Sequence, residues 1–241
     1  MEHPDDTVER PVSGAALPPT SWTLLAEAAG DDPGGARDEL VARYYGPVQA
    51  YVRAISRDPE RTQDLTQAFF EHVVLSGRLL RAADRRRGSF RALLKQALRN
   101  FLTDDVRRRQ LAVRREVHPD ADTQGWDAVG ASAVDSAEVA YHDAWVRALL
   151  ELALARVRDT CTARGQDAHF RLFAARYLEP SAEVPSWREL GATIGVDEKA
   201  ARNRTETVVR HLRLVLRRML IDETGSASEA DAELTALLAR L

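Results

Sequence analysis

The sequence has one cysteine, Cys161, only two lysines and no long hydrophobic run. A single thiol cannot form a disulfide or a multi-thiolate metal site within one chain, which favours a reduced, intracellular setting. No stretch approaches the roughly 20 apolar residues that a membrane span requires. The first residues are acidic and contain proline, so they lack the basic start and apolar run of a secretory signal. We therefore expect a cytoplasmic protein without a membrane span.

Sequence signatures of common catalytic sites are also missing. The six histidines are scattered without metal-ligand spacing, and no G-x-S-x-G, P-loop or H-E-x-x-H motif occurs. We therefore predict that the protein is not an enzyme and that it needs neither a metal nor another cofactor.

Charge is segregated along the chain, although its net value is only -3 over 241 residues. Residues 81–115 hold twelve basic against three acidic residues, and residues 198–218 hold seven against two. Residues 1–40 and 222–241 are acidic. One basic block alone would fit a solvated helix face, but two in an otherwise acidic chain are typical of a nucleic-acid-binding protein.

Apolar residues recur at the helical period of 3.6 through most of the chain, and strand-like alternation is absent. Both observations predict an all-α fold. Helical segments are expected from Thr20, across 40–55, from about Thr62 to Leu80 (62–80) and after Ser89, with a break at Asp58–Pro59. Ser89 is the expected N-cap of the last of these helices.

The stretch 116–136 is rich in Asp, Gly, Ser and Ala and has no sustained period, which predicts a flexible linker between two helical domains. The leucines of the acidic tail lie at helical spacing and predict a short helix. This helix docks on a domain, covers a basic face or stands alone. The predicted parts are a disordered lead, a first helical domain, the linker, a second helical domain and the tail, in residues 1–19, 20–115, 116–136, 137–221 and 222–241.

A helix-turn-helix is predicted in the second domain. Ser186 and Glu189 have the spacing of a capping box. Gly191 stands where two helices must approach closely, and Gly195 supplies the positive φ of a sharp turn. Asp197 is the expected N-cap of a long basic helix, although an ordinary helical hairpin is the alternative. The residues expected at base edges in the major groove are Lys199, Arg202, Asn203 and Arg204.

The stretch 81–110 places basic side chains between an apolar helix face and flanking loops. Such an arrangement suits a phosphate backbone, including that of single-stranded DNA, because salt-dependent affinity comes from counterion release. Phe90 and Phe101 lie at core spacing and are expected to pack inside.

Three segments together resemble the sigma-70 family of bacterial transcription-initiation factors, extracytoplasmic-function type. They are DLTQAFFEHVV at 64–74, GSFRALLKQALRNFLTDDVRRR at 88–109, and the helix-turn-helix. The resemblance covers nearly the whole chain from Thr20 and implies a region 2 bundle followed by a region 4 helix-turn-helix domain. It also implies binding to core RNA polymerase, at the β′ coiled coil and the β flap, and to promoter DNA.

The resemblance assigns roles to residues at the matching positions. Ala201 and Thr205 depart from the family's usual larger apolar residues, which affects packing more than the assignment. The residues that match the helix docking on the β′ coiled coil are Asp64, Gln67, Phe69 and Phe70. Those that match the contact with the melted -10 element are Arg91, Lys95, Arg99, Asn100, Asp104, Arg107 and Arg108. Those that match the helix recognising the -35 element are Arg202, Asn203 and Arg204.

The docking helix lacks three carboxylates that the family usually has, in residues 61–63 and at Ala68. Losing several charge pairs is expected to weaken the affinity for polymerase. Thr62 and Thr66 occupy this gap. We hypothesise that a Ser/Thr kinase phosphorylates Thr62, which places about -1.5 to -2 charges near a helix N-terminus, where negative charge is favoured. A kinase-regulated subset of the family is similar; the alternative is that Thr62 is only an N-cap.

Two other classes of protein remain open. A one-component helix-turn-helix regulator would act without binding core polymerase, but such proteins are usually dimers with a ligand cavity, and nothing in the sequence suggests one. A helical adaptor or an anti-sigma-like protein is disfavoured by the two basic blocks. The further partners that the resemblance implies are a Ser/Thr kinase or an anti-sigma factor.

Overall fold

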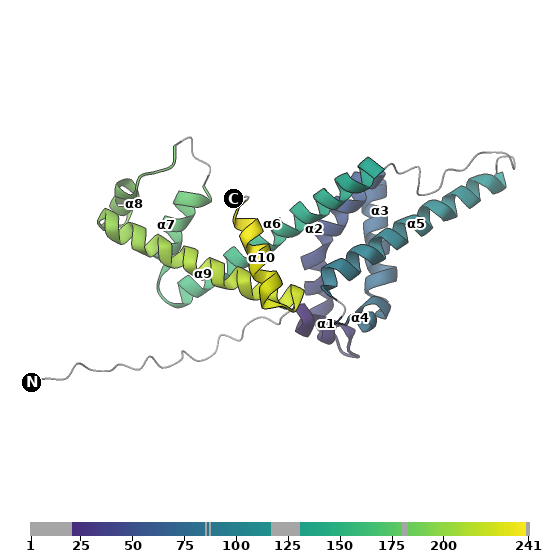
Figure 1. Cartoon of the computed structure of the whole chain (residues 1–241), viewed down its shortest axis with the longest axis horizontal. Helices are drawn as coiled ribbons and strands as arrows, with labels where there is room; N and C mark the ends of the chain where they lie inside the picture. Colours follow the sequence, from purple (N-terminus) through teal and green to yellow (C-terminus); the bar gives the residue numbers. More distant parts are fainter. Residues whose placement is uncertain (1–20, 85, 87, 117–130, 180–182, 240–241) are drawn as a thin grey trace, which may run out of the picture.

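The computed structural model describes residues 21–84, 86, 88–116, 131–179 and 183–239, and their regular elements are all helices (Figure 1). The prediction of an all-α chain is therefore confirmed for this part of the chain. None of the described helices combines the length and the apolar composition needed to cross a bilayer. The elements are α1 (Ser21–Ala29), α2 (Ala36–Ser56), α3 (Pro59–Phe69), the π-helical turn η1 (Phe70–Val74), α4 (Arg78–Ala82), α5 (Phe90–Glu116), α6 (Ala131–Ala163), α7 (Asp167–Tyr177), α8 (Trp187–Thr193), α9 (Glu198–Thr224) and α10 (Ala227–Leu238).

The boundary between α2 and α3 lies at Asp58–Pro59, as predicted. The carboxylate of Asp58 accepts hydrogen bonds from the N–H groups of Glu60 and Arg61 at 3.0 and 3.3 Å. The continuous helix expected across 62–80 is wrong, because η1 follows α3 and a turn precedes α4. Gly77 has φ +75° in this turn, a left-handed backbone that glycine adopts without the steric cost of a Cβ.

Helices α1, α3 and α5 pack against α2, and α4 packs against α1 and η1. Tyr44 and Tyr51 of α2 are buried, and the ring of Tyr44 meets Phe90 of α5 edge to face, with centroids 5.3 Å apart. Ser89 caps α5 as expected, because its Oγ accepts a hydrogen bond from the N–H of Ala92 at 3.3 Å. Burying one large apolar side chain stabilises a fold by about 1.5–3 kcal/mol. Phe90 and Phe101 pack inside as predicted, and the apolar residues of α5 that are buried or partly buried are Phe90, Leu93, Leu94, Ala97, Leu98, Phe101 and Leu102.

The long helix α6 packs along α2 and belongs to the same core (Figure 1). Tyr141, Trp145 and Leu149 of α6 are buried in the cluster that contains the core residues of α1 to α5. The ring of Tyr141 meets Tyr51 edge to face, with centroids 6.2 Å apart. One continuous core therefore connects parts of the chain that were expected in separate domains. The buried residues that α9 and α10 add to it are Leu216, Met219, Leu220, Ala230 and Leu237.

The linker predicted for 116–136 differs from the structure at its C-terminal end. Residues 117–130 lie outside the described residues, whereas 131–136 form the first turns of α6 and are not a linker. Ala137, which follows directly, is fully buried. Alanine has a high helix propensity, and packing on α2 stabilises α6, so the Ser and Asp residues of this stretch do not end the helix.

A buried hydrogen bond connects α2 with the C-terminal part of α9. The hydroxyl of Tyr44 donates to Oε1 of Glu223 at 2.7 Å, and Glu223 is only 5% exposed. Burial, and then the neighbouring carboxylate, hold the pKa of Tyr44 well above its ordinary value, so the phenol stays protonated and continues to donate. A buried carboxylate is costly without hydrogen bonds, and this contact therefore favours the packed arrangement.

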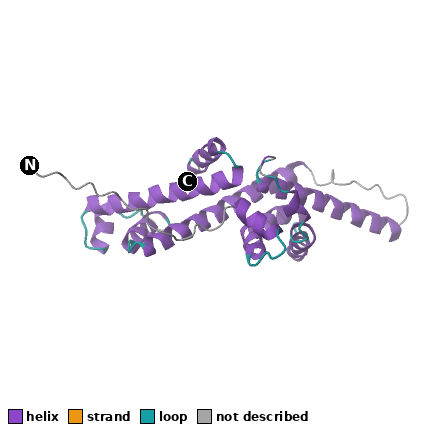
Figure 2. Ribbon diagram, turned by 90° about the horizontal axis from the view of Figure 1, so that it is seen from below, coloured by secondary structure: helices purple, strands orange, loops and turns teal. Residues whose placement is uncertain are grey.

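Helices α7, α8 and the first half of α9 form a smaller unit at the end of the molecule away from α5; Figure 2 shows the same elongated arrangement from below. Phe173 of α7 and Val208 of α9 are buried together with two residues of α6, Val157 and Cys161. Leu172, Leu190 and Ala201 form a second small cluster between α7, α8 and α9. The long helices α6 and α9 connect this unit to the main core.

We expect Tyr44→Phe to lower the free energy of unfolding by about 1–3 kcal/mol, because it removes a hydrogen-bond donor from a buried carboxylate. Tyr45→Phe is the matched control: the partly buried ring of Tyr45 stacks on Phe70 with centroids 5.8 Å apart, and losing its hydroxyl should change stability by less than about 0.5 kcal/mol. Urea unfolding followed by circular dichroism measures both. Equal effects of the two substitutions would contradict a stabilising Tyr44–Glu223 bond.

Candidate nucleic-acid interface

The first helix of the helix-turn-helix, α8, begins with the predicted capping box. The Oγ of Ser186 accepts a hydrogen bond from the N–H of Glu189 at 3.3 Å, and the Glu189 carboxylate accepts one from the N–H of Ser186 at 2.7 Å. The Ser186 hydroxyl also donates to the Glu189 carboxylate at 2.7 Å, and this hydrogen bond, followed by that from the Ser186 N–H, lowers the pKa of Glu189. Two backbone N–H groups that lack helical partners are thus satisfied, which fixes where α8 starts.

The turn between α8 and α9 has the predicted geometry. A Cβ on Gly191 would lie 2.5 Å from the carbonyl oxygen of Val196, so only glycine allows this approach. Gly195 has φ +71°. Asp197 caps α9, with its carboxylate accepting a hydrogen bond from the N–H of Ala200 at 2.7 Å. The direction in which α9 leaves the turn is therefore set by local geometry.

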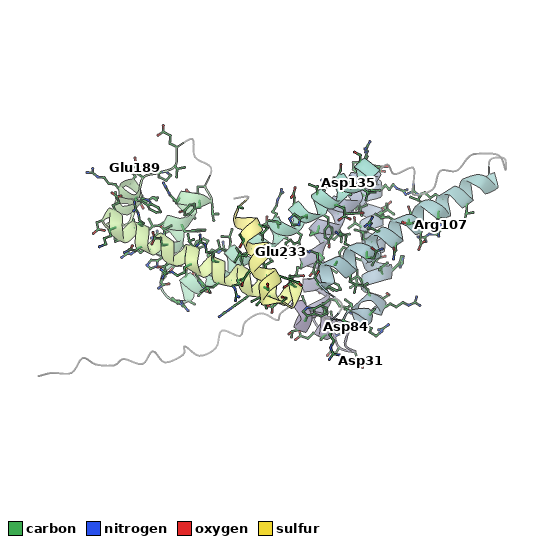
Figure 3. The ribbon with its side chains drawn as sticks, viewed as in Figure 1. Asp31, Asp84, Arg107, Asp135, Glu189 and Glu233 are labelled. Atoms are coloured by element: carbon green, nitrogen blue, oxygen red, sulfur yellow. The ribbon has the colours of Figure 1, made fainter. Side chains whose placement is uncertain are left out.

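Three of the four residues expected at base edges face solvent at the start of α9: Lys199, Arg202 and Asn203. The guanidinium of Arg202 lies 5.7 Å from the ring centroid of Trp187 and 3.6 Å from the carboxylate of Glu198, yet 51% of the side chain is exposed. In Figure 3, the label of Glu189 shows this unit at one end of the molecule, and the label of Arg107 shows α5 at the other end.

Arg204, the fourth of these residues, is half-buried on the side of α9 that faces α7. Burial, and then the charge of Arg204, lower the pKa of His169 on α7. Ala201 and Thr205, which are smaller than the family's usual residues, are fully buried. The hydroxyl of Thr205 donates to the carbonyl of Ala201 at 3.0 Å, so this buried polar group has a partner.

A row of basic residues, Arg91, Lys95 and Arg99, follows one face of α5 at four-residue spacing. All three contact carboxylates of the chain itself. The Nη1 of Arg91 lies 2.9 Å from Oε1 of Glu233 on α10. Lys95 forms an ion pair with Glu138 of α6, and Arg99 lies 3.8 Å from the same carboxylate. The basic row is thus partly neutralised from two other helices.

Two further basic residues of α5, Arg107 and Arg108, line a groove of about 990 Å³ between α3, η1 and α5. Arg107 and Arg108 are exposed there, and Asn100 lines the same groove. Asp104 lies 4.0 Å from Arg107, in an exposed pair that contributes little to stability. Guanidinium groups beside an apolar surface suit the phosphates and bases of a single strand. The apolar lining consists of Leu65, Ala68, Val73, Ala97, Phe101 and Leu111.

The predicted docking residues divide between the surface and the core. Asp64 and Gln67 are exposed on α3, and Gln67 donates to the carboxylate of Glu71 at 2.9 Å. Phe69 and Phe70 are 0% and 4% exposed. Both phenylalanines match the docking helix of the family, but in this conformation they fill the core beneath the exposed face of α3 and do not lie on its surface.

Thr62 and Thr66 were expected in the gap that the missing carboxylates leave on the docking surface, and this placement is wrong. Thr62 is 2% exposed, and its hydroxyl donates to the carbonyl of Asp58 at 2.7 Å and lies 2.7 Å from the Oγ of Ser56. Thr66 is fully buried and donates to the carbonyl of Thr62 at 2.6 Å. The N-cap of α3 is Asp58, so Thr62 is not an N-cap either. Both hydroxyls donate to a carbonyl group of the preceding turn inside the bundle, so each buried hydroxyl has a hydrogen-bond partner.

Two residues of this interface, Glu138 and Glu233, were not found from the sequence. An acidic residue on a helix gives no local sign of a cation that lies 43 or 142 positions away. The one sequence feature that pointed to such ion pairs was the opposite charge of the acidic tail and the basic blocks. Asp105 likewise pairs with Arg61 at 2.6 Å across α3 and α5.

The described residues contain no cluster of three or more histidine, cysteine or acidic side chains that would hold a metal ion. Cys161 is a buried free thiol whose pKa is raised by burial. No family model, no curated protein and no solved structure matches the chain.

We expect Thr62→Glu to lower the free energy of unfolding by roughly 2–5 kcal/mol, because it places a carboxylate at a buried position. Gln63→Glu is the matched control: it adds the same charge to the exposed neighbouring position on α3 and should change stability by less than about 0.5 kcal/mol. Thermal and urea unfolding measure both variants. A Thr62→Glu chain as stable as the wild type would show that this site opens easily.

Proposed function

We propose that the chain is a transcription-initiation factor of the sigma-70 class, extracytoplasmic-function type, which acts in the cytoplasm and is not an enzyme. In this proposal it binds core RNA polymerase at the β′ coiled coil and the β flap and directs it to promoter DNA. The observation that carries the proposal is the helix-turn-helix that presents Lys199, Arg202 and Asn203 to solvent, at the opposite end of the molecule from the basic helix α5.

The start of α9 suits the major groove of duplex DNA. A recognition helix contacts base edges with its first residues and the phosphate backbone with residues further along. Arg202 and Asn203 have the side chains that pair with guanine and adenine edges. Exposed Arg210 and Arg213 follow on the same helix, where they suit phosphates. This unit is proposed to recognise the -35 element.

The basic row of α5 and the neighbouring groove suit the melted -10 element. Arg107 and Arg108 offer guanidinium groups at the rim of an apolar groove, a combination that binds single strands through phosphates and base faces. Arg91, Lys95 and Arg99 add three further basic side chains to α5, on the side that meets α6 and α10. The affinity that such residues supply falls as the salt concentration rises.

We further propose that the chain works on promoters as two helical domains, a region 2 bundle and a region 4 helix-turn-helix, connected by the segment between α5 and α6. Separating them exposes Tyr141, Trp145 and Leu149, which the continuous core now buries. Each such side chain contributes about 1.5–3 kcal/mol, so the polymerase surface has to replace this burial.

Asp64 and Gln67 are the proposed polymerase contacts on the exposed face of α3, with Phe69 and Phe70 supporting that face from the core. We also propose that a Ser/Thr kinase phosphorylates Thr62 once the surrounding structure has opened. Because the hydroxyl is buried against Asp58, the turn between α2 and α3 has to open before a kinase reaches it.

In vitro transcription with purified core polymerase tests the proposal. We expect core enzyme together with this chain to yield defined transcripts that core enzyme alone does not produce. The reaction is run with untreated chain and with chain treated by a Ser/Thr kinase. A chain that binds duplex DNA but never associates with core polymerase would instead be a one-component regulator.

We expect Asp64→Lys to weaken association with core polymerase roughly tenfold, because it reverses a charge in the proposed contact. Asp159→Lys, a reversal at an exposed site of α6, is the control and should leave the affinity unchanged. Biolayer interferometry on immobilised core enzyme measures both. Equal affinities of the two variants would rule out this face of α3 as the docking site.

We expect Arg202→Ala to weaken binding to a duplex selected by the wild-type protein from a random pool by about 1–3 kcal/mol, and to relax the preference at one base pair. Arg171→Ala removes an exposed arginine from α7 and serves as the control, with little effect on base preference. Fluorescence anisotropy with matched and mutated duplexes gives both quantities. Undiminished selectivity of Arg202→Ala would exclude it from base contact.

A further inference from the structure

The acidic helix α10 lies between two basic helices, α5 and α9, in the middle of the molecule (Figure 3). The Asp231 carboxylate accepts two hydrogen bonds from the guanidinium of Arg217 on α9, at 2.5 and 2.9 Å. The carboxylate of Glu233 accepts one from Arg91 on α5 at 2.9 Å. One short helix thus contacts arginines from both basic blocks of the sequence.

These contacts are held in place by apolar packing. Ala230 and Leu237 of α10 are buried in the main core. On α5, the guanidinium of Arg91 lies 3.8 Å from the ring centroid of Trp145, so it is fixed between an aromatic face of α6 and the carboxylate of Glu233. The position of α10 is therefore part of the fold and does not depend on exposed ion pairs alone.

Helix α6 neutralises the rest of the basic row. Glu138 pairs with Lys95 and lies 3.8 Å from Arg99. Two carboxylates, Glu138 and Glu233, thereby contact all three cations of the row. Carboxylates and phosphates use the same donors of arginine and lysine, so a nucleic-acid phosphate has to displace these glutamates to bind there.

We propose that α6 and α10 hold the chain in an autoinhibited state, in which Glu138 and Glu233 occupy the phosphate-binding side chains of α5 and nucleic acid competes with them. This inference rests on the proposed function of α5 as a DNA-binding helix. Lys199, Arg202 and Asn203 remain exposed in the same state. The recognition helix is thus free to bind duplex DNA while the single-strand surface of α5 is still occupied.

The test uses the full-length chain and a fluorescein-labelled oligothymidine of 20 nucleotides, with affinity measured by anisotropy over a series of salt concentrations. E138Q/E233Q removes both inhibitory charges. E151Q/E229Q is the matched control, since it makes the same change at exposed positions of α6 and α10 that have no ion pair within the described residues. Neither polymerase nor a promoter is needed.

We expect E138Q/E233Q to bind the oligonucleotide roughly three- to tenfold more tightly than the wild type and the control, since the three ion pairs of Glu138 and Glu233 no longer compete. Its logarithmic salt dependence should steepen by about 0.7 for each additional phosphate neutralised. In the wild-type chain, saturating oligonucleotide should also increase hydrogen exchange in α10, a sign of displacement that a merely structural role of α10 would not give.

Equal affinities of the wild type and E138Q/E233Q for the oligonucleotide would overturn autoinhibition but would not contradict the proposed function. An equal gain for E151Q/E229Q would also overturn it, because net charge would then explain the effect. Failure of every variant to bind would overturn both proposals. If the double variant loses its helical circular dichroism signal, the single variants E138Q and E233Q are measured in the same assay. Each is then expected to show a smaller gain in affinity for the oligonucleotide.

Discussion

The packing of α6 against α2 is the contact on which the arrangement of the other parts depends. Tyr141, Trp145 and Leu149 enter the core that α1 to α5 build, and α9 then returns beside α6 to add Leu216 and Leu220. The free energy gained by burying these apolar side chains is larger than that of the ion pairs at the surface. The Tyr44–Glu223 hydrogen bond, the position of α10 and the approach of Glu138 to α5 all follow from this packing.

Because of this packing, the two basic surfaces of the chain differ in availability. The start of α9 lies at the far end of the molecule, where none of the described acidic helices covers Lys199 or Asn203. The basic row of α5 lies against α6 and α10, where carboxylates contact all three cations. Acidic and basic segments of the chain are thus paired in space, and the balance between paired and free forms is sensitive to any competing polyanion.

The segment DLTQAFF shows how one short motif serves two purposes. Its polar members Asp64 and Gln67 lie on the exposed face of α3, whereas Phe69 fills the core and Phe70 packs on Tyr45. Thr66 faces inward as well, because its hydroxyl is satisfied by the preceding turn. Substitutions in such a motif affect docking and stability through different residues, and stability has to be measured before a loss of partner binding is interpreted.

The sequence by itself determined the features that depend on residues a few positions apart. The all-helical character, the Asp58–Pro59 boundary, the capping box of Ser186 and the glycine turn at Gly195 follow from backbone hydrogen bonds and local steric limits. Only the tertiary structure decided that Thr62 is buried, that 131–136 are helical and that Glu233 meets Arg91. Those outcomes depend on which helix faces meet across large sequence separations, and local sequence carries no record of that geometry.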